Sequence, residues 1–163
     1  MQSNATLDRY DIKILHELQE DGALSNQELA ERVGLTAAPC SRRVKQLEET
    51  GVIASRVVRI DESKVNLTII VLLNISMDKH TPERFETFEK AIAKIPEVME
   101  CYVITGNTAD YHLKIAVPDL QSYHDILLGK ITRIEGVSGV HSSFILRKVV
   151  DSTALPLEYA QRK

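Results

Sequence analysis

The fold of the first part of the chain is decided in residues 25–47, which read SNQELAERVGLTAAPCSRRVKQL. Ser25 and Glu28 have the spacing of a capping box, in which each side chain satisfies a free backbone N–H of the other residue at a helix start. Apolar side chains then recur at helical spacing until Gly34, which ends this helix. Thr36 can cap the next helix, so two short helices are separated by very few residues.

A third helix is predicted before this pair. Apolar side chains recur at helical spacing over residues 7–18, and Asp8 and Asp11 lie where negative charge stabilises a helix start. Three short helices so close in sequence predict a helix-turn-helix unit. The β-rich residues 52–60 are expected to form a small wing beside them.

The later part of the chain changes its hydrophobic period. Strands are predicted at 67–77, 98–105, 111–117 and 137–150, and helices at 82–95 and 120–134. This β-α-β-β-α-β order is typical of a ferredoxin-like unit, an antiparallel sheet with both helices on one face. The uncovered face, with Ile70, Leu72 and Met99 among its candidate residues, is expected to meet another subunit.

The predicted fold class is therefore α+β, with two domains. A winged helix-turn-helix domain is expected at residues 1–60 and a linker at 61–66. A ferredoxin-like βαββαβ domain is expected at 67–150, followed by a tail at 151–163.

Composition fits a globular protein of this size. The chain has 163 residues, of which 44% are hydrophobic and 26% charged. Its most apolar stretch, residues 67–77, is far shorter than the roughly 20 residues of a spanning helix, so no membrane association is expected. Residues 1–7 do not resemble a secretory signal, which favours a cytoplasmic protein. Cys40 and Cys101 are then expected to be buried thiols.

Any binding of nucleic acid must come from a local basic patch, because the net charge is -3. With Cys40, Val44 and Leu47 facing inward, the opposite face of that helix carries small side chains followed by Ser41, Arg42 and Lys45. Side chains of this kind suit a DNA major groove. A solvated helix face is the alternative interpretation of the charges alone, but the tight helix pair favours DNA.

Catalysis is not supported by any pattern in the sequence. The five histidines lack metal-ligand spacing, and no nucleophile elbow or glycine-rich phosphate loop is present, so no enzyme, metal site or cofactor is expected. A turn at 105–110 could hold a small zwitterion, with Asp110 accepting an ammonium group. It is also readable as an ordinary hairpin turn, since Gly, Asn and Asp are usual turn residues.

Several linked motifs together resemble the Lrp/AsnC family, the leucine-responsive and asparagine-operon regulators. They cover the chain from about Leu7 to the Leu-Pro-Leu of residues 155–157. The motifs are LDRYDIKIL at 7–15, ELAERVGLT at 28–36, PCSRRVKQLE at 39–48, GVI at 51–53, PEV at 96–98, EC at 100–101, TG at 105–106, DY at 110–111, GV at 136–137 and SSF at 142–144.

The resemblance implies a transcription regulator that binds promoter DNA and a small amino acid. It implies a homodimer formed through the sheet, an octamer-like assembly of dimers, and a nucleoid-associated protein. The residues expected to contact double-stranded DNA are Asn26, Ala37, Ala38, Pro39, Ser41, Arg42, Arg43, Lys45, Gln46 and Arg56. The residues expected to bind the amino acid are Thr105, Gly106, Asn107, Thr108 and Asp110, with a facing contribution from Ser138 or Ser142.

One turn departs from the family pattern. Members read Gly, Asp, one residue, Asp, Tyr, whereas residues 106–111 read GNTADY, one residue longer and with Asn107 in place of the first acid. This predicts a changed or weakened amino-acid response. A mainly architectural DNA-bending protein with little effector dependence is the alternative. An enzyme or amino-acid carrier is a third interpretation, but it requires a catalytic constellation that the sequence does not show.

Overall fold

The structure is a computed structural model that describes residues 7–106 and 108–161. These residues form two compact units. The helical unit contains residues 7–59 together with 150–161, and the sheet unit contains residues 60–149. No helix in the described ranges is long and apolar enough to cross a membrane.

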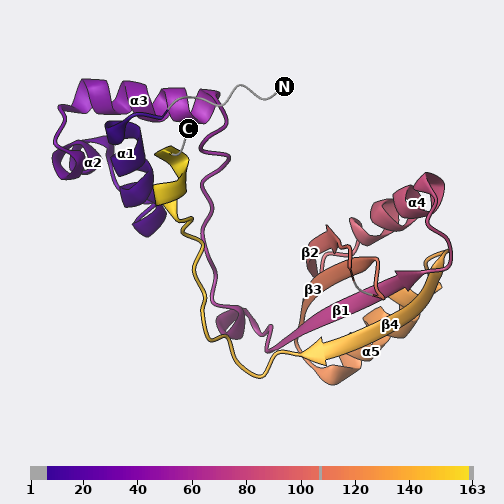
Figure 1. Cartoon of the computed structure of the whole chain (residues 1–163). Coiled ribbons are helices and arrows are strands. Elements are labelled where there is room, and N and C mark those ends of the chain that lie inside the picture. The colour runs from indigo at the N-terminus through magenta and orange to yellow at the C-terminus, as the bar shows by residue number, and fades with distance from the viewer. Residues whose placement is uncertain (1–6, 107, 162–163) are drawn as a thin grey trace. The chain divides into compact units, whose positions relative to one another are not determined.

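The helical unit contains α1 (Arg9–Glu20), α2 (Asn26–Val33) and α3 (Ala37–Glu49), drawn in indigo to purple in Figure 1. The capping box predicted at Ser25 and Glu28 is present, with N–H to side-chain distances of 2.9 and 3.2 Å. Asp8 forms a second capping box, with Asp11, at the start of α1. Thr36 occupies the N-cap of α3, but its side chain makes no capping hydrogen bond.

The core of the helical unit is built from the apolar stripes that the sequence predicts. Its buried side chains are Ile14, Leu15, Leu24, Leu29, Ala30, Val33, Cys40, Val44 and Leu47. Cys40 is completely buried, as expected, and it packs as a small apolar side chain. Burial of the inner stripe of α3 fixes which of its side chains remain outside.

The expected strands of a wing are not formed within residues 52–60. This segment follows α3 without regular secondary structure, and the side chains of Val57 and Val58 are 78% and 87% exposed. A β-rich composition makes a strand only where a neighbouring strand supplies hydrogen-bond partners. The described chain provides no such partner for this segment.

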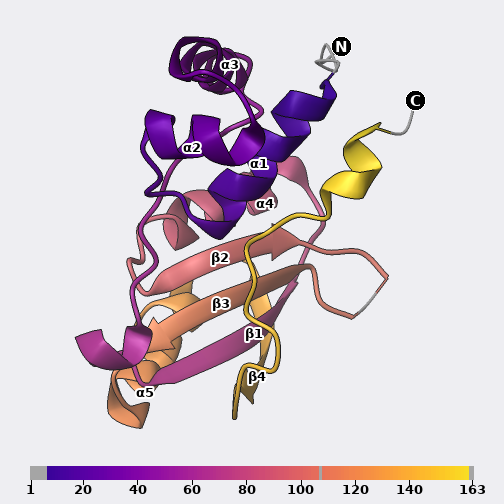
Figure 2. The same cartoon turned by 90° about the vertical axis from the view of Figure 1, so that its left-hand side faces the viewer.

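The sheet unit has the predicted β-α-β-β-α-β order. Its elements are β1 (Ile69–Met77), α4 (Pro82–Ile92), β2 (Val98–Val103), β3 (Tyr111–Val117), α5 (Leu120–Gly129) and β4 (Val137–Phe144). All neighbouring strands are antiparallel, in the order β2-β3-β1-β4 that Figure 2 shows. Short 3₁₀ helices are found at η1 (Glu62–Val65), η2 (Ile131–Arg133) and η3 (Leu157–Gln161). The ferredoxin-like prediction is confirmed.

Both helices cover the same face of this sheet. Val71, Leu73 and Ile75 alternate along β1 and pack in one cluster with Phe88 of α4 and Tyr123 of α5. The residues between them on β1 point to the opposite face, which neither α4 nor α5 covers.

Several details differ from the sequence-based expectations. β1 begins at Ile69 instead of residue 67, α4 ends at Ile92 instead of 95, and β2 ends at Val103 instead of 105. The final strand ends at Phe144 instead of residue 150, because its pairing partner β1 begins at Ile69 and leaves residues beyond 145 unpaired. The last helix ends at Gly129 and is followed by a 3₁₀ turn, since Lys130 leaves the helical conformation. Cys101 is exposed, because it lies on the edge strand β2 instead of a central strand.

Gly136 provides a test of the turn before β4. Its φ is +94°, and a Cβ there would lie 2.9 Å from Met77 Cε and 3.1 Å from Arg84 Cδ. We expect Gly136→Ala to lower the free energy of unfolding by about 1–3 kcal/mol through strain and crowding. Gly129→Ala is the control, since its Cβ would meet no atom within 4 Å. Equal denaturation midpoints for the two variants would contradict this expectation.

Candidate functional site

The outer face of α3 begins with small, exposed residues. Ala37, Ala38 and Pro39 are exposed in its first turn, so another molecule can approach the backbone closely. Arg42 follows, also exposed, and has no ion-pair or hydrogen-bond partner among residues 7–106 and 108–161. A free guanidinium beside small side chains suits hydrogen bonding to base edges or phosphates.

A polar hollow of about 410 Å³ lies between the start of α2 and the outer side of α3. It is lined by Leu24, Ser25, Asn26, Ser41, Val44, Lys45, Glu48 and Arg56. The Asn26 amide donates to Ser41 Oγ at 3.4 Å, which joins the two helices across the hollow. The structure thus brings four predicted DNA-contact residues, Asn26, Ser41, Lys45 and Arg56, around one concave surface.

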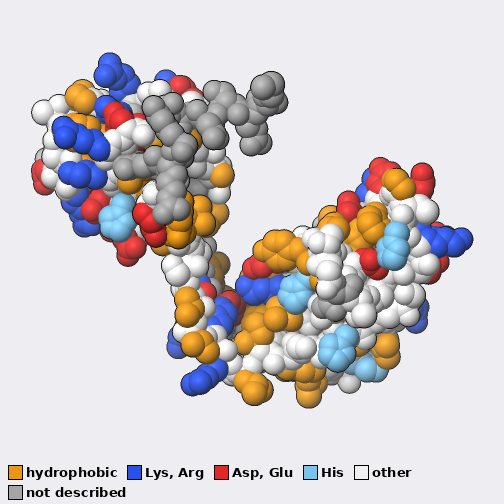
Figure 3. Space-filling model, in the orientation of Figure 1, with side chains coloured by type: hydrophobic (Ala, Val, Ile, Leu, Met, Phe, Trp, Pro, Cys, Tyr) orange, Lys and Arg blue, Asp and Glu red, His pale blue; other side chains and the backbone are white. Residues whose placement is uncertain are grey.

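The cations at this surface are held only by exposed ion pairs. Lys45 lies 3.5 Å from Glu49, and Arg56 lies 3.2 Å from Glu48. Exposed pairs of this kind contribute little stability, so the cations can move onto a phosphate backbone at small cost. Figure 3 shows Lys and Arg side chains at several points around α2 and α3. Gln46 is exposed on the same helix.

Arg43 is placed differently from the other predicted contacts. Its guanidinium lies 2.8 Å from both Asp8 Oδ2 and Asp11 Oδ1, and 5.5 Å from the centre of the Tyr10 ring. Hydrogen bonding to Asp11 and then Asp8 raises the pKa of Arg43. The pKa of Asp8 is lowered mainly by the N–H of Asp11, with Tyr10 N–H and Arg43 adding to the effect. Arg43 therefore braces α3 against the start of α1.

The predicted effector turn is attached to the end of β1. Gly106 has φ +84°, the left-handed conformation that glycine favours. Ser76 Oγ donates to the Thr108 carbonyl oxygen at 3.1 Å, and Ser138 Oγ donates to the Ser76 carbonyl oxygen at 3.0 Å. Thr105 is exposed before Gly106, and Asn107 lies outside the described residues. The structure therefore brings Ser138 to the turn through Ser76.

Asp110 already has partners within the chain. Its Oδ2 accepts the N–H of Met77 at 2.7 Å, and its Oδ1 lies 2.7 Å from Nε2 of His80. Its carboxylate therefore hydrogen-bonds to the backbone of the last residue of β1, a role that the sequence did not indicate. Sequence reasoning missed Met77 and His80 because they are far from Asp110 in the chain and come near it only when the end of β1 pairs with the start of β3. An ammonium group at this turn would share a carboxylate with these groups.

Ser142 does not lie at this turn. It is opposite Leu73 in the register of β1 and β4, on the helix-covered side of the sheet. Its hydroxyl makes a short hydrogen bond with that of Tyr123 on α5. Of the two serines expected to face the effector, the geometry therefore favours Ser138.

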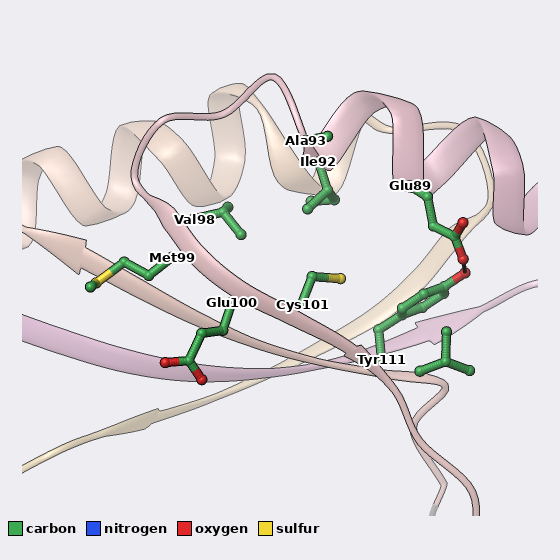
Figure 4. A pocket seen from close by; sticks show the side chains of 9 residues that line it. Glu89, Ile92, Ala93, Val98, Met99, Glu100, Cys101 and Tyr111 are labelled. Atoms are coloured by element: carbon green, nitrogen blue, oxygen red, sulfur yellow. Dashed lines mark hydrogen bonds between the residues drawn. The ribbon is translucent and has the colours of Figure 1, made fainter. Parts of the chain in front are cut away.

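A second hollow, of about 370 Å³, lies between α4 and β2 (Figure 4). The Tyr111 hydroxyl donates to Glu89 Oε1 at 2.9 Å across it, and Cys101 also lines it. Partial desolvation in this hollow, reinforced by Glu89, raises the pKa of Tyr111 and of the Cys101 thiol, although part of the Cys101 side chain stays exposed. A thiol kept protonated is a poor nucleophile, so this hollow gives no support to covalent chemistry.

Comparison with known proteins defines the class. Residues 7–54 match the model of winged helix-turn-helix DNA-binding domains, and residues 70–155 match that of the Lrp/AsnC ligand binding domain. With the fold described above, these matches define a DNA-binding transcriptional regulator with an amino-acid-binding domain, and not an enzyme. The protein belongs to the Lrp/AsnC family.

The relatives match over almost their full length. The chain is 41% identical to the Bkd operon transcriptional regulator of Pseudomonas aeruginosa, covering 94% of this chain and 99% of the relative. It is 36% identical to the leucine-responsive regulatory protein of Escherichia coli, over 93% and 92% of the two chains. A transcriptional regulator from Neisseria meningitidis, solved as a complex with L-Met, superposes with a TM-score of 0.91 at 38% identity, over 94% and 99%.

The contacts of Arg43 allow a test of whether this side chain holds α3 against α1 or contacts DNA. We expect Arg43→Gln to destabilise the helical unit by about 1 kcal/mol, because two carboxylates lose their shared partner. Thermal unfolding followed by circular dichroism measures this loss. Arg43 is instead a phosphate contact if the variant keeps its stability while the slope of log K for DNA binding against log salt concentration falls by about one.

Proposed function

We propose that the protein is a sequence-specific regulator that controls genes of amino-acid metabolism or transport in response to a small amino acid. The observation that carries this proposal is the free outer face of α3, where Arg42 stands beside exposed small residues and the polar hollow. The domain division proposed from the sequence serves this function. Residues 1–60 would bind DNA, 61–66 would connect, and 67–150 would bind the effector and the partner subunit.

The proposed DNA contacts have two roles. Arg42, Ala37 and Ala38 would face base edges as the start of α3 enters a major groove. Asn26, Lys45 and Arg56 surround the hollow and would hold the phosphate backbone, which sets the position of α3 without reading sequence. Binding to chromosomal DNA would make this a nucleoid-associated protein of the cytoplasm.

The proposed effector site centres on the turn tied to β1. Backbone groups near Gly106 and the hydroxyls of Ser76 and Ser138 can bind the carboxylate and ammonium groups of an amino acid. The L-Met complex of the Neisseria meningitidis regulator supports an amino acid as the ligand class. Because Asp110 is already engaged by Met77 and His80, we expect binding weaker than in a site with a free carboxylate.

A second copy of the chain is the proposed partner of the open sheet face. Four polar side chains on this face are already paired within the chain, with His112 Nδ1 2.8 Å from Asn74 Oδ1 and Lys114 Nζ 2.9 Å from Glu100 Oε1. Polar groups paired in this way keep their hydrogen bonds when a partner covers the face. Apolar side chains of the segments that connect the units are also exposed, at Val57, Val58, Ile60, Leu146, Val149 and Val150. We propose dimers through these surfaces, assembling further into an octamer.

A mainly architectural protein is the second candidate function. The engaged carboxylate of Asp110, together with the lengthened turn, favours a protein that bends DNA with little dependence on an effector. The helical units of several chains in one oligomer would then bind the same DNA molecule together, with modest sequence preference.

Selection of genomic fragments with the purified protein, at two salt concentrations and with or without pooled amino acids, tests both candidates. A regulator enriches a few promoter fragments, and amino acids change its affinity for them. Broad, strongly salt-sensitive enrichment that ignores amino acids supports the architectural function instead.

The selected fragment allows a test of Arg42. We expect Arg42→Ala to weaken specific binding by about 1–3 kcal/mol if Arg42 reads a base, with no loss of thermal stability because the side chain is free. Fluorescence anisotropy on specific and random DNA measures the difference. Unchanged affinity for the selected fragment would remove Arg42 from the interface.

Calorimetric titration with a panel of amino acids tests the effector turn. We expect weak or altered binding, and we expect Ser138→Ala to reduce it further because Ser138 joins the turn through Ser76. Ser142→Ala is the matched control, since this hydroxyl bonds to Tyr123 on the other side of the sheet. Tight leucine binding by the unchanged protein would contradict the expectation that the lengthened turn weakens or alters amino-acid binding.

A further inference from the structure

A segment from the far end of the chain is built into the helical unit. Residues 150–161 follow the sheet unit in sequence, yet they pack with residues 7–59. Figure 1 shows this segment in yellow, ending near α1. Leu157 is partly buried against the core that α1, α2 and α3 share.

Gln19 of α1 makes a two-point contact with this segment. The N–H of Leu155 donates to Gln19 Oε1 at 2.7 Å, and Gln19 Nε2 donates to the Leu155 carbonyl oxygen at 3.2 Å. A carboxamide carries a donor and an acceptor side by side, as a peptide group does. Gln19 therefore pairs with Leu155 much as a residue of a neighbouring strand would, and it satisfies both backbone groups.

Ion pairs join the incoming and outgoing chain within each unit. In the helical unit, Arg59 Nη2 lies 2.7 Å from Asp151 Oδ2, and Arg59 also donates to the Asp151 carbonyl oxygen at 3.3 Å. In the sheet unit, Lys148 Nζ lies 2.5 Å from Glu62 Oε1. The chain that leads into β1 is thus linked to the chain that leaves β4.

We propose that the surface of α1 around Gln19 is a docking site for the chain's own C-terminal segment, and that the docked segment orients the helical unit. The backbone passes between the two units at residues 59–60 and again at 149–150. With residues 150–161 docked, the helical unit is held at two points. With these residues released, one flexible connection remains and the helical unit rotates more freely.

This restriction has a consequence for DNA binding, and this part of the inference rests on the proposed function. An oligomer that binds two sites on one DNA molecule must align two helical units. A helical unit whose rotation is already restricted loses less conformational freedom when it binds. The second helical unit of the oligomer therefore binds the same DNA molecule more tightly. Docking would therefore strengthen binding to paired sites and leave binding to a single site nearly unchanged.

Amide exchange in the full-length protein tests the docking. We expect Gln19→Ala to speed exchange of the Leu155 amide about tenfold, since its acceptor is lost and the segment opens more often. Leu157→Ala, on the segment itself, should act in the same direction. Glu20→Ala is the matched control, because Glu20 is exposed next to Gln19 and makes no side-chain hydrogen bond or ion pair with described residues 150–161. An unchanged Leu155 exchange rate in Gln19→Ala overturns the docking proposal.

DNA affinity tests the orienting role. We compare Gln19→Ala with Glu20→Ala on DNA that carries one or two copies of a selected site, after circular dichroism shows that both variants keep their helices. We expect the advantage of two copies over one to fall about threefold or more in Gln19→Ala only. A released segment with an unchanged advantage overturns the orienting role. If the protein binds no specific DNA, the proposed function fails, while the exchange measurement still decides the docking.

Discussion

The sheet unit depends on β1, which, like β3, is paired with a neighbouring strand along both of its edges. It pairs with β3 on one side and β4 on the other, and Val71, Leu73 and Ile75 on its inner face are completely buried. The helix-covered face of this strand carries apolar side chains only, so its polar contacts are made on the open face, as by Asn74, and at its ends. The candidate effector turn and Asp110 are fixed at one end of β1, and the chain from the helical unit enters at the other. Any ligand that moves the turn acts directly on this strand.

In the helical unit, α3 is held in place on one side and exposed on the other. Burial of Cys40, Val44 and Leu47 sets its rotation, and Arg43 fixes its position against α1 through Asp8 and Asp11. Arg42, beside Arg43, has no hydrogen-bond or ion-pair partner among the residues that the structure describes. Two neighbouring arginines therefore have different surroundings because successive residues of a helix point about 100° apart.

Much of the fold could be predicted because its signals are local. The capping box at Ser25, the apolar stripes of α1 to α3 and the change of period before β1 each occur within a few residues. The wing strands and the extension of β4 to residue 150 were wrong for one shared reason. Val57 and Val149 belong to segments of high β propensity, but a strand also needs a partner that propensity does not supply.

The sequence by itself determined the capping box at Ser25, the buried stripes, the order of elements and the family, because these depend on the chemistry of neighbouring residues. Only the tertiary structure decided the partners of Asp110, Arg43 and Gln19, since each meets groups far away in the chain. Periodicity shows which face of an element is buried, but not which distant residue lies opposite. The register of the strands and the packing of the helices supply that information. They show that Asp110, expected to bind an effector, Arg43, expected to contact DNA, and Gln19, a surface amide, each join distant parts of the chain.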